Sequence, residues 1–228
     1  MLKDLSYPNM QPRFGNESRR ALTFIEVLVV IALLAVLAVM ILPGVEPAPR
    51  TAQRVNCVNN LKQVNLALRI WEEDNNNEYP MQVAVTNGGG KEWMIAGDVA
   101  DCFRVVSNEL STARILICPA DTDHTIATNF DSDFNNSHIS YFFGVDVTND
   151  NNPRMVLDGD DNLAINGTVV KSGVFDLSTN AAASWTAARH RHVGNIGFAD
   201  GSVLEESSNG LQEALIQTGL ATSRIAIP

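Results

Sequence analysis

An apolar segment near the N-terminus constrains this chain more than any other feature. Residues 22–42 read LTFIEVLVVIALLAVLAVMIL, with Glu26 as their single charge. A helix of this length spans roughly 30 Å, which is the thickness of the hydrocarbon core of a bilayer. Because a helix in lipid satisfies its own backbone hydrogen bonds, the segment is predicted to form a transmembrane helix despite its many β-branched residues.

The sequences on both sides of this segment differ from it in composition. Residues 1–21 lack an apolar period, which is typical of a leader or tail rather than a folded element, and their basic residues lie just before the apolar segment, where a positive-inside signal is expected. Pro43-Gly44, Pro47 and Pro49 follow the segment and predict a break or kink in the helix.

A second helical period covers residues 50–74, within a predicted 43–78 region of kink and amphipathic helix. We expect its apolar stripe to pack on a sheet. The stripe consists of Val55, Val58, Leu61, Val64, Leu68 and Trp71.

Residues 79–228 are polar and rich in turns, and they predict a β-rich extracytoplasmic domain. A further helix is expected at 209–218. Candidate strands are 103–106, 114–118, 139–144, 168–175, 193–199 and 202–206. The expected fold is α+β: one long N-terminal helix, membrane-spanning in its first half and amphipathic in its second, packed on a small antiparallel sheet.

Charge and cysteine content narrow the class of protein. The net charge of −10 argues against nucleic acid as a partner, since such binding needs a basic face. Three cysteines leave at least one unpaired within the chain. Cys102 and Cys118 are the predicted disulfide pair if the domain lies outside the cytoplasm; the alternative is that Cys57 and these two are free, half-buried thiols.

Glu26 is out of place in an apolar helix, because a carboxylate in hydrocarbon costs a few kcal/mol or more. Arg20 lies six residues back, beyond one helical turn. A neighbouring chain could supply the missing cation.

The stretch from Ala21 to Leu28, ALTFIEVL, resembles the prepilin processing motif of type IV pilins and type II secretion pseudopilins. The resemblance implies cleavage between Ala21 and Leu22, N-methylation of Leu22, and pairing of the new α-amine with Glu26 of another subunit during assembly. Ala21 replaces the usual Gly and Leu22 the usual Phe, which bears on the efficiency of cleavage.

Later segments resemble pilin-like proteins of planctomycetes and verrucomicrobia. The similar segments are Cys57 to Gln63 (CVNNLKQ), Cys118 to Asp121 (CPAD), Ser140-Tyr141-Phe142, and the His-x9-Asp-Gly motif formed by His190, Asp200 and Gly201. The order of these segments along the chain is more specific than any one of them.

The resemblance implies a structural subunit of a type IV pilus or type II secretion filament, active in protein transport and not an enzyme. Its implied partners are prepilin peptidase, other pilin-like subunits, the inner-membrane assembly platform and membrane lipid. Its implied location is the inner membrane, as a single-pass protein with an extracytoplasmic C-terminal domain, or a filament at the periplasm or cell surface. The alternative is a membrane-anchored extracytoplasmic module that binds a glycan or calcium and does not polymerise.

No cofactor is expected except calcium, for which Asp158, Asp160 and Asn162 space their oxygens suitably without completing an EF-hand loop. His190, His192 and Asp200 could also bind a metal. The simpler interpretation places Asp200-Gly201 in a turn and His190 at the start of a hairpin.

Overall fold

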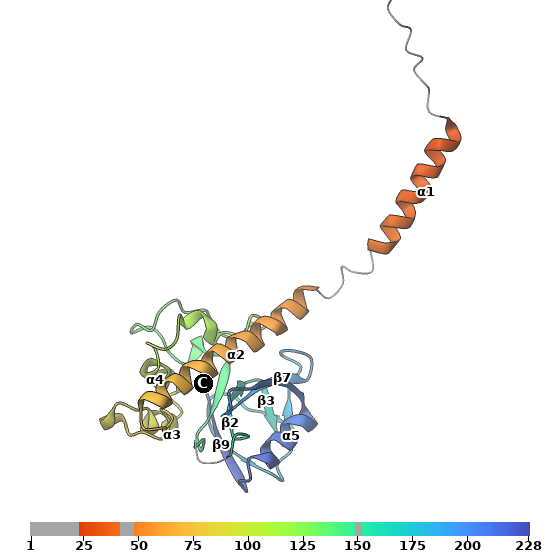
Figure 1. The fold of residues 1–228 in the computed structure, drawn as a ribbon. Helices are drawn as coiled ribbons and strands as arrows, with labels where there is room; N and C mark the ends of the chain where they lie inside the picture. Colours follow the sequence, from red (N-terminus) through yellow and green to blue (C-terminus); the bar gives the residue numbers. More distant parts are fainter. Residues whose placement is uncertain (1–22, 42–47, 149–151) are drawn as a thin grey trace, which may run out of the picture. The chain divides into compact units, whose positions relative to one another are not determined.

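The computed structural model describes residues 23–41, 48–148 and 152–228 (Figure 1). The chain divides into two compact units, Met1–Glu46 and Pro47–Pro228. The boundary lies within the proline-containing stretch where the sequence predicts a break. Helix α1 (Phe24–Ile41) belongs to the first unit, and all other described elements belong to the second.

The prediction of one long N-terminal helix with a membrane-spanning first half is wrong. α1 and α2 (Ala48–Asp74) are separate helices of 18 and 27 residues. Among the described residues, none of the helices has the length and apolar character that a membrane crossing requires. The prolines at 43, 47 and 49 oppose a continuous helix.

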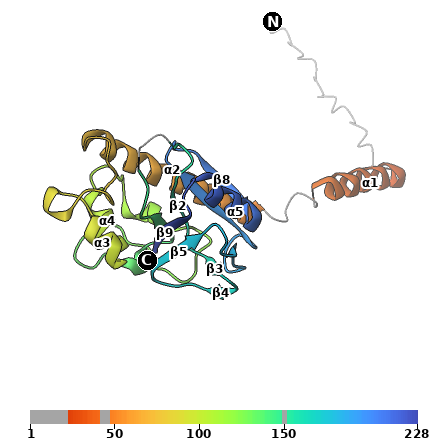
Figure 2. The same cartoon turned by 90° about the horizontal axis from the view of Figure 1, so that it is seen from below.

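The sheet is larger than predicted, so the chain is a sheet-rich α+β protein. A six-stranded antiparallel sheet has the order β5-β9-β1-β2-β7-β8, and a three-stranded sheet has the order β4-β3-β6 (Figures 1 and 2). The strands are β1 (Tyr141–Gly144), β2 (Val156–Asp160), β3 (Leu163–Ile165), β4 (Thr168–Val169), β5 (Gly173–Ser178), β6 (Ala183–Trp185), β7 (Val193–Phe198), β8 (Val203–Ser207) and β9 (Thr222–Ile227).

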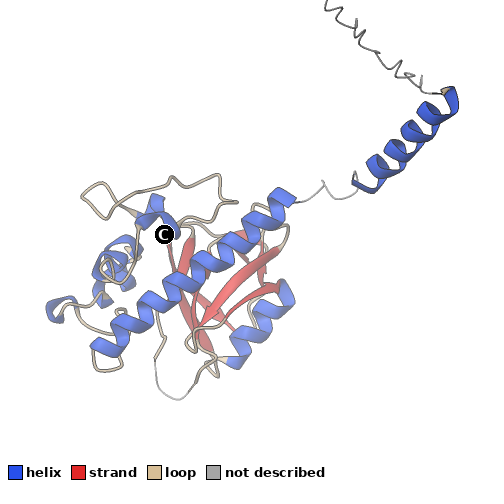
Figure 3. Ribbon diagram, turned by 45° about the horizontal axis from the view of Figure 1, so that its top comes forward, coloured by secondary structure: helices blue, strands red, loops and turns tan. Residues whose placement is uncertain are grey.

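Helices cover both faces of the six-stranded sheet. α2 crosses one face (Figure 3), and α5 (Ser208–Gln217) packs with the apolar side chains of the other. Alternation along β1 divides its residues between the two cores: Tyr141 and Phe143 lie in the cluster with α2, and Phe142 lies in the cluster with α5. Polar side chains of β2 that face α2 are therefore sealed between helix and sheet.

The buried stripe of α2 differs from the predicted one at its start. Leu61, Val64, Leu68 and Trp71 are buried as predicted, but Val55 is 53 % exposed. Cys57 takes the buried position instead, one helical turn before Leu61. The helix thus presents a thiol to the sheet where the sequence predicted valine.

Two predicted strands are helical. Residues 103–106 fall largely in α4 (Val99–Val105), and residues 114–118 overlap η3 (Ala113–Leu116), because short apolar runs fit a buried helix as well as a strand. Side-chain caps start both elements: Asp98 accepts from Asp101 N, and Thr112 accepts from Arg114 N. The remaining short helices are η2 (Val85–Asn87), α3 (Lys91–Ala96) and η4 (Asn136–His138).

The hairpin predicted at Asp200-Gly201 is confirmed. It joins β7 to β8, and Gly201 has a φ of 85°, which favours glycine. Asp200 Oδ1 accepts a hydrogen bond from Ser202 N at 2.8 Å.

Candidate metal centre

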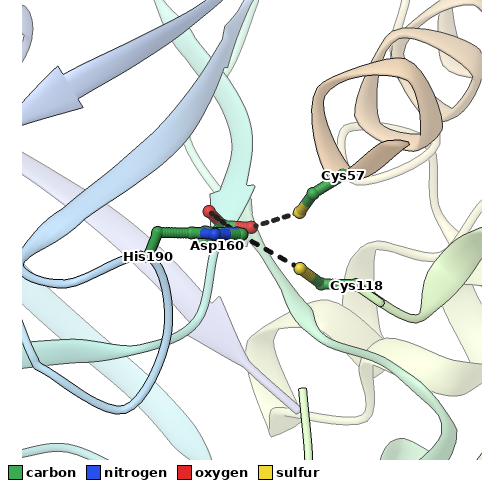
Figure 4. Close-up of side chains that lie close together, drawn as sticks. All are labelled: Cys57, Cys118, Asp160 and His190. Carbon is green, nitrogen blue, oxygen red and sulfur yellow. Dashed lines mark hydrogen bonds and ion pairs between the residues drawn. The ribbon is translucent and has the colours of Figure 1, made fainter. Parts of the chain in front are cut away.

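Four side chains that are distant in sequence converge between α2 and the sheet. Cys57 comes from α2, Cys118 from the segment after η3, Asp160 from the end of β2, and His190 from the loop before β7. Figure 4 shows the two thiols facing the carboxylate and the imidazole. One potential ligand atom from each residue lies within 4.8 Å of all the others, so the group could hold a metal ion.

The separations within the cluster are short and its atoms are buried. Cys57 Sγ lies 3.2 Å from Asp160 Oδ1, and Cys118 Sγ lies 3.3 Å from His190 Nε2. His190 Nε2 lies 3.7 Å from Asp160 Oδ2, and the side chain of His190 is 1 % exposed. Cys57, Cys118 and Asp160 are each 0 % exposed.

Backbone structure fixes each contributor. The register of β1 with β2 places Asp160 opposite Tyr141. Asn60 of α2 donates a hydrogen bond to Ile117 O at 3.0 Å, which holds the residue before Cys118 against the helix. His190, Arg191 and His192 have positive φ values of 44°, 55° and 65°, an uncommon run that turns the chain sharply before β7.

A further layer of hydrogen bonds orients the carboxylate. Asn195 donates from its backbone N at 2.8 Å and from Nδ2 at 2.9 Å, both to Asp160 Oδ2. Asp160 Oδ1 is left facing the thiol of Cys57. The hydroxyl of Tyr141 lies 3.6 Å from Cys57 Sγ, so this thiol also has a polar neighbour.

Arg189 forms a buried ion network beside the cluster. Its guanidinium lies 2.6 Å from Asp121 Oδ2 and 2.5 Å from Asp161 Oδ1, and it donates to Ser140 O at 2.9 Å. His124 Nδ1 lies 2.8 Å from Asp121 Oδ2. Two segments of chain therefore meet through two pairs of side chains: Cys118 contacts His190, and Asp121 contacts Arg189.

Without a metal, the four titratable groups of the cluster shift one another's pKa values. Burial raises the pKa of the Cys57 thiol and of the Asp160 carboxyl. The hydrogen bond from Cys57, together with His190, lowers the pKa of Cys118 to about 6. Burial acts to lower the pKa of His190, but the hydrogen bond to Cys118 and the charge of Asp160 raise it above its usual value. Burial disfavours the anionic forms of Cys57 and Asp160, and a bound cation would stabilise these anionic forms.

The Cys118–His190 contact by itself would resemble the thiolate–imidazole pair of a cysteine nucleophile. Cys118 is fully buried, however, and Cys57 and Asp160 stand around the same point. The arrangement is suited to holding an ion.

The predicted calcium site does not form as a loop. Asp158 and Asp160 lie on strand β2 and are both 0 % exposed, and Asn162 Nδ2 donates to Thr186 O. The cluster that does form contains two sulfurs, and Ca²⁺ prefers oxygen ligands. The geometry therefore retains Asp160 as a metal-ligand candidate in a different set.

The predicted metal ligands His190, His192 and Asp200 do not come together in one site. His190 joins the cluster, whereas Asp200 and Gly201 lie at the far end of β7 in the hairpin turn. His192 has its Nδ1 3.2 Å from Trp185 O. A six-residue strand of about 20 Å separates the two ends of the motif, so they cannot share a ligand.

The structure does not pair Cys102 with Cys118, since all three cysteines are free and buried. Cys102 lies in α4, and Cys118 lies beside His190. The predicted cleavage residues Ala21 and Leu22 fall outside the described residues. Glu26 lies in the exposed first turn of α1.

Sequence reasoning missed Cys57 and Cys118 as ligands. No local spacing could reveal them, because the four residues come from four separate segments. The available signal was that Cys57, Cys118 and His190 each begin or anchor one of the family-like segments, which would be expected if those segments met in space.

In comparisons with known proteins, no family model, curated protein or solved structure matches this chain.

Proposed function

We propose that this protein is a pilin-like structural subunit that assembles with further copies or related subunits through helix α1. The observation that supports it is the surface of that helix. Its 18 residues carry one charge, and every side chain described from Thr23 to Val39 is exposed, with Phe24 at 84 % and Ile25 at 70 %.

A helix that is apolar on all sides is not stable with all of its surface in water. Each large side chain buried against a partner contributes about 1.5–3 kcal/mol. The equivalent helices of other subunits offer a matching surface, so that helix-on-helix packing would form the core of an assembly.

Glu26 gives this packing its polarity. It occupies the first turn of α1, where the helix dipole favours a carboxylate, and Thr23 O accepts from Glu26 N at 3.0 Å. Buried among neighbouring helices, the carboxylate would require a cation. The α-amine of Leu22 in an adjacent subunit, released by cleavage after Ala21, would supply it.

The first experiment tests processing. The protein is produced in a host with an active prepilin peptidase, and the N-terminus of the purified product is sequenced. A chain beginning at Leu22 with a methylated amine is expected. A product that retains Met1 contradicts the proposal.

The second experiment tests assembly. Glu26→Gln keeps the size of the side chain and removes its charge, and Glu73→Gln on the exposed surface of α2 is the matched control. The protein concentration needed to form sedimentable, cross-linkable polymer is expected to rise at least about tenfold for Glu26→Gln, corresponding to about 1.4 kcal/mol or more per contact, and to stay unchanged for the control. Equal assembly by both variants would refute the charge-pairing step.

The alternative is a membrane-anchored module that binds a glycan or calcium and does not polymerise. Its calcium version is less well supported, because the cluster that includes Asp160 contains two sulfurs, whereas Ca²⁺ prefers oxygen ligands.

A further inference from the structure

We propose that Cys57, Cys118, Asp160 and His190 form a closed, four-coordinate structural site for Zn²⁺ that fastens α2 to the sheet. The proposal is independent of how the subunit assembles.

The separations fit a tetrahedral zinc ion. Zinc–ligand bonds of roughly 2.3 Å to sulfur and 2.0–2.2 Å to nitrogen or oxygen give ligand-to-ligand separations of about 3.3–3.8 Å. The observed contacts are 3.2 Å between Cys57 Sγ and Asp160 Oδ1 and 3.3 Å between Cys118 Sγ and His190 Nε2, and all four potential ligand atoms lie within 4.8 Å of one another. The ion fits between these atoms once the wider separations contract by up to about 1 Å.

The donor types select the metal. Thiolate and imidazole favour zinc among the common divalent ions, and hard oxygen-seeking ions such as Ca²⁺ and Mg²⁺ are disfavoured by the two sulfurs. All four donors are protein side chains and all are buried, so no coordination position remains for water or substrate. Such a closed set is characteristic of a structural site.

The surroundings meet a further requirement of a zinc site. Asn195 holds Asp160 through two hydrogen bonds to Oδ2, which leaves Oδ1 for the ion.

The ion would act as a cross-link. Its ligands lie at positions 57, 118, 160 and 190, so their union fixes α2, the segment after η3, β2 and the approach to β7 at one point. At the other end of β7, Arg69 of α2 donates to Asp200 O at 3.2 Å. Arg69 lies twelve residues after Cys57, which corresponds to about 18 Å along the helix, close to the ~20 Å of the six-residue strand. The two ends of the His-x9-Asp-Gly motif therefore contact α2 at two places, His190 near Cys57 and Asp200 at Arg69.

The first test is metal content. Full-length protein without a histidine tag is purified, its bound metals are measured by mass spectrometry, and apo protein is titrated with Zn²⁺ and with Co²⁺. About one equivalent of zinc is expected, with cobalt absorption showing tetrahedral geometry and thiolate-to-metal charge transfer. Chelation is expected to lower Tm by about 10 °C.

Variants separate ligands from other buried groups. Cys57→Ser and His190→Gln should each lower zinc affinity by at least about 100-fold, and Cys57→Ser should weaken the thiolate-to-cobalt band. Cys102→Ser is the matched control, since Cys102 is a free, buried thiol of the same core that lies outside the cluster. It should bind zinc as wild type does, whatever its effect on Tm.

Three results would overturn the proposal. The first is wild-type protein that takes up no zinc after reconstitution and melts identically with zinc and with chelator. The second is a Cys57–Cys118 disulfide in the freshly purified protein. The third is equal zinc loss in Cys102→Ser and Cys57→Ser. Because the wild-type measurements do not depend on any variant, a ligand variant that fails to fold leaves the proposal testable.

Discussion

Asp158 and Asp160 lie two residues apart on the same face of β2 and are both 0 % exposed, yet their surroundings differ completely. Asp160 receives two hydrogen bonds from Asn195 and faces a thiol and an imidazole. Asp158 faces Asn65 of α2, and neither side chain has a hydrogen-bond partner among the described residues. Burial raises the pKa of Asp158 well above its usual value.

The difference teaches that burial of a carboxyl group does not by itself make a site. Burial disfavours the charged form of Asp158, whereas Asp160 is surrounded by groups able to share a cation. A side chain at Gly197 would collide with both Asp158 and Asn65, so glycine there leaves them room. Substitutions at the two aspartates and around them would sharpen the contrast.

The largest effect is expected from Asp160→Asn. Loss of the anionic ligand leaves two thiols and an imidazole without their common ion, so the free energy of unfolding should fall by about 3–5 kcal/mol. Urea unfolding with saturating zinc measures this. A change below about 1 kcal/mol would place Asp160 in the same class as Asp158.

Asp121→Asn should cost about 2 kcal/mol at neutral pH, because it removes charged hydrogen bonds to Arg189 and His124. Although burial acts to raise it, the pKa of Asp121 is held well below its usual range by His124 and Arg189. Its contribution to stability is therefore present above about pH 4 and is lost as the pH falls below that value.

The contribution of His124 to stability depends on pH in the opposite direction from that of Asp121. Its hydrogen bond to Asp121 raises the pKa of the imidazole, so its contribution is present below about pH 6.5 and is lost as the pH rises through the folded-state value. Urea unfolding of wild type, Asp121→Asn and His124→Gln over a pH series checks both signs. The difference in free energy of unfolding between wild type and Asp121→Asn should shrink toward low pH. A difference that stays constant would show that the charged contacts of Asp121 do not cause it.

Asn195→Ala should cost about 1–2 kcal/mol and weaken zinc binding by about 10–100-fold, because Asp160 would lose one of the two hydrogen bonds that orient it. The zinc affinity of the variant, measured against a chromogenic chelator, tests this positioning role. Lowered stability with unchanged affinity would show that Asn195 serves packing alone.

The smallest effect is expected from Asp158→Asn. The substitution keeps the shape of a side chain whose charged form is disfavoured by burial, so the free energy of unfolding should change by less than about 1 kcal/mol and zinc content should not change. Loss of zinc by this variant would erase the distinction between the two aspartates.

The sequence by itself determined the local elements with strong periods. The helix predicted at 50–74 is α2, the helix predicted at 209–218 is α5, and Asp200-Gly201 forms the predicted hairpin turn, because helical spacing and a positive-φ glycine are local properties. The assignment of 103–106 and 114–118 as strands failed, since short apolar runs carry no reliable period.

Only the tertiary structure decided which polar residues meet. His190 was visible as part of a motif, but its neighbours come from α2, from the segment after η3 and from β2, and long-range packing alone brings those segments together. The same packing placed Cys57 inside and Val55 outside, against the expected stripe. Apolar burial does not demand a particular residue at this end of the helix, whereas a shared ion would, because coordination needs four ligand atoms at defined distances.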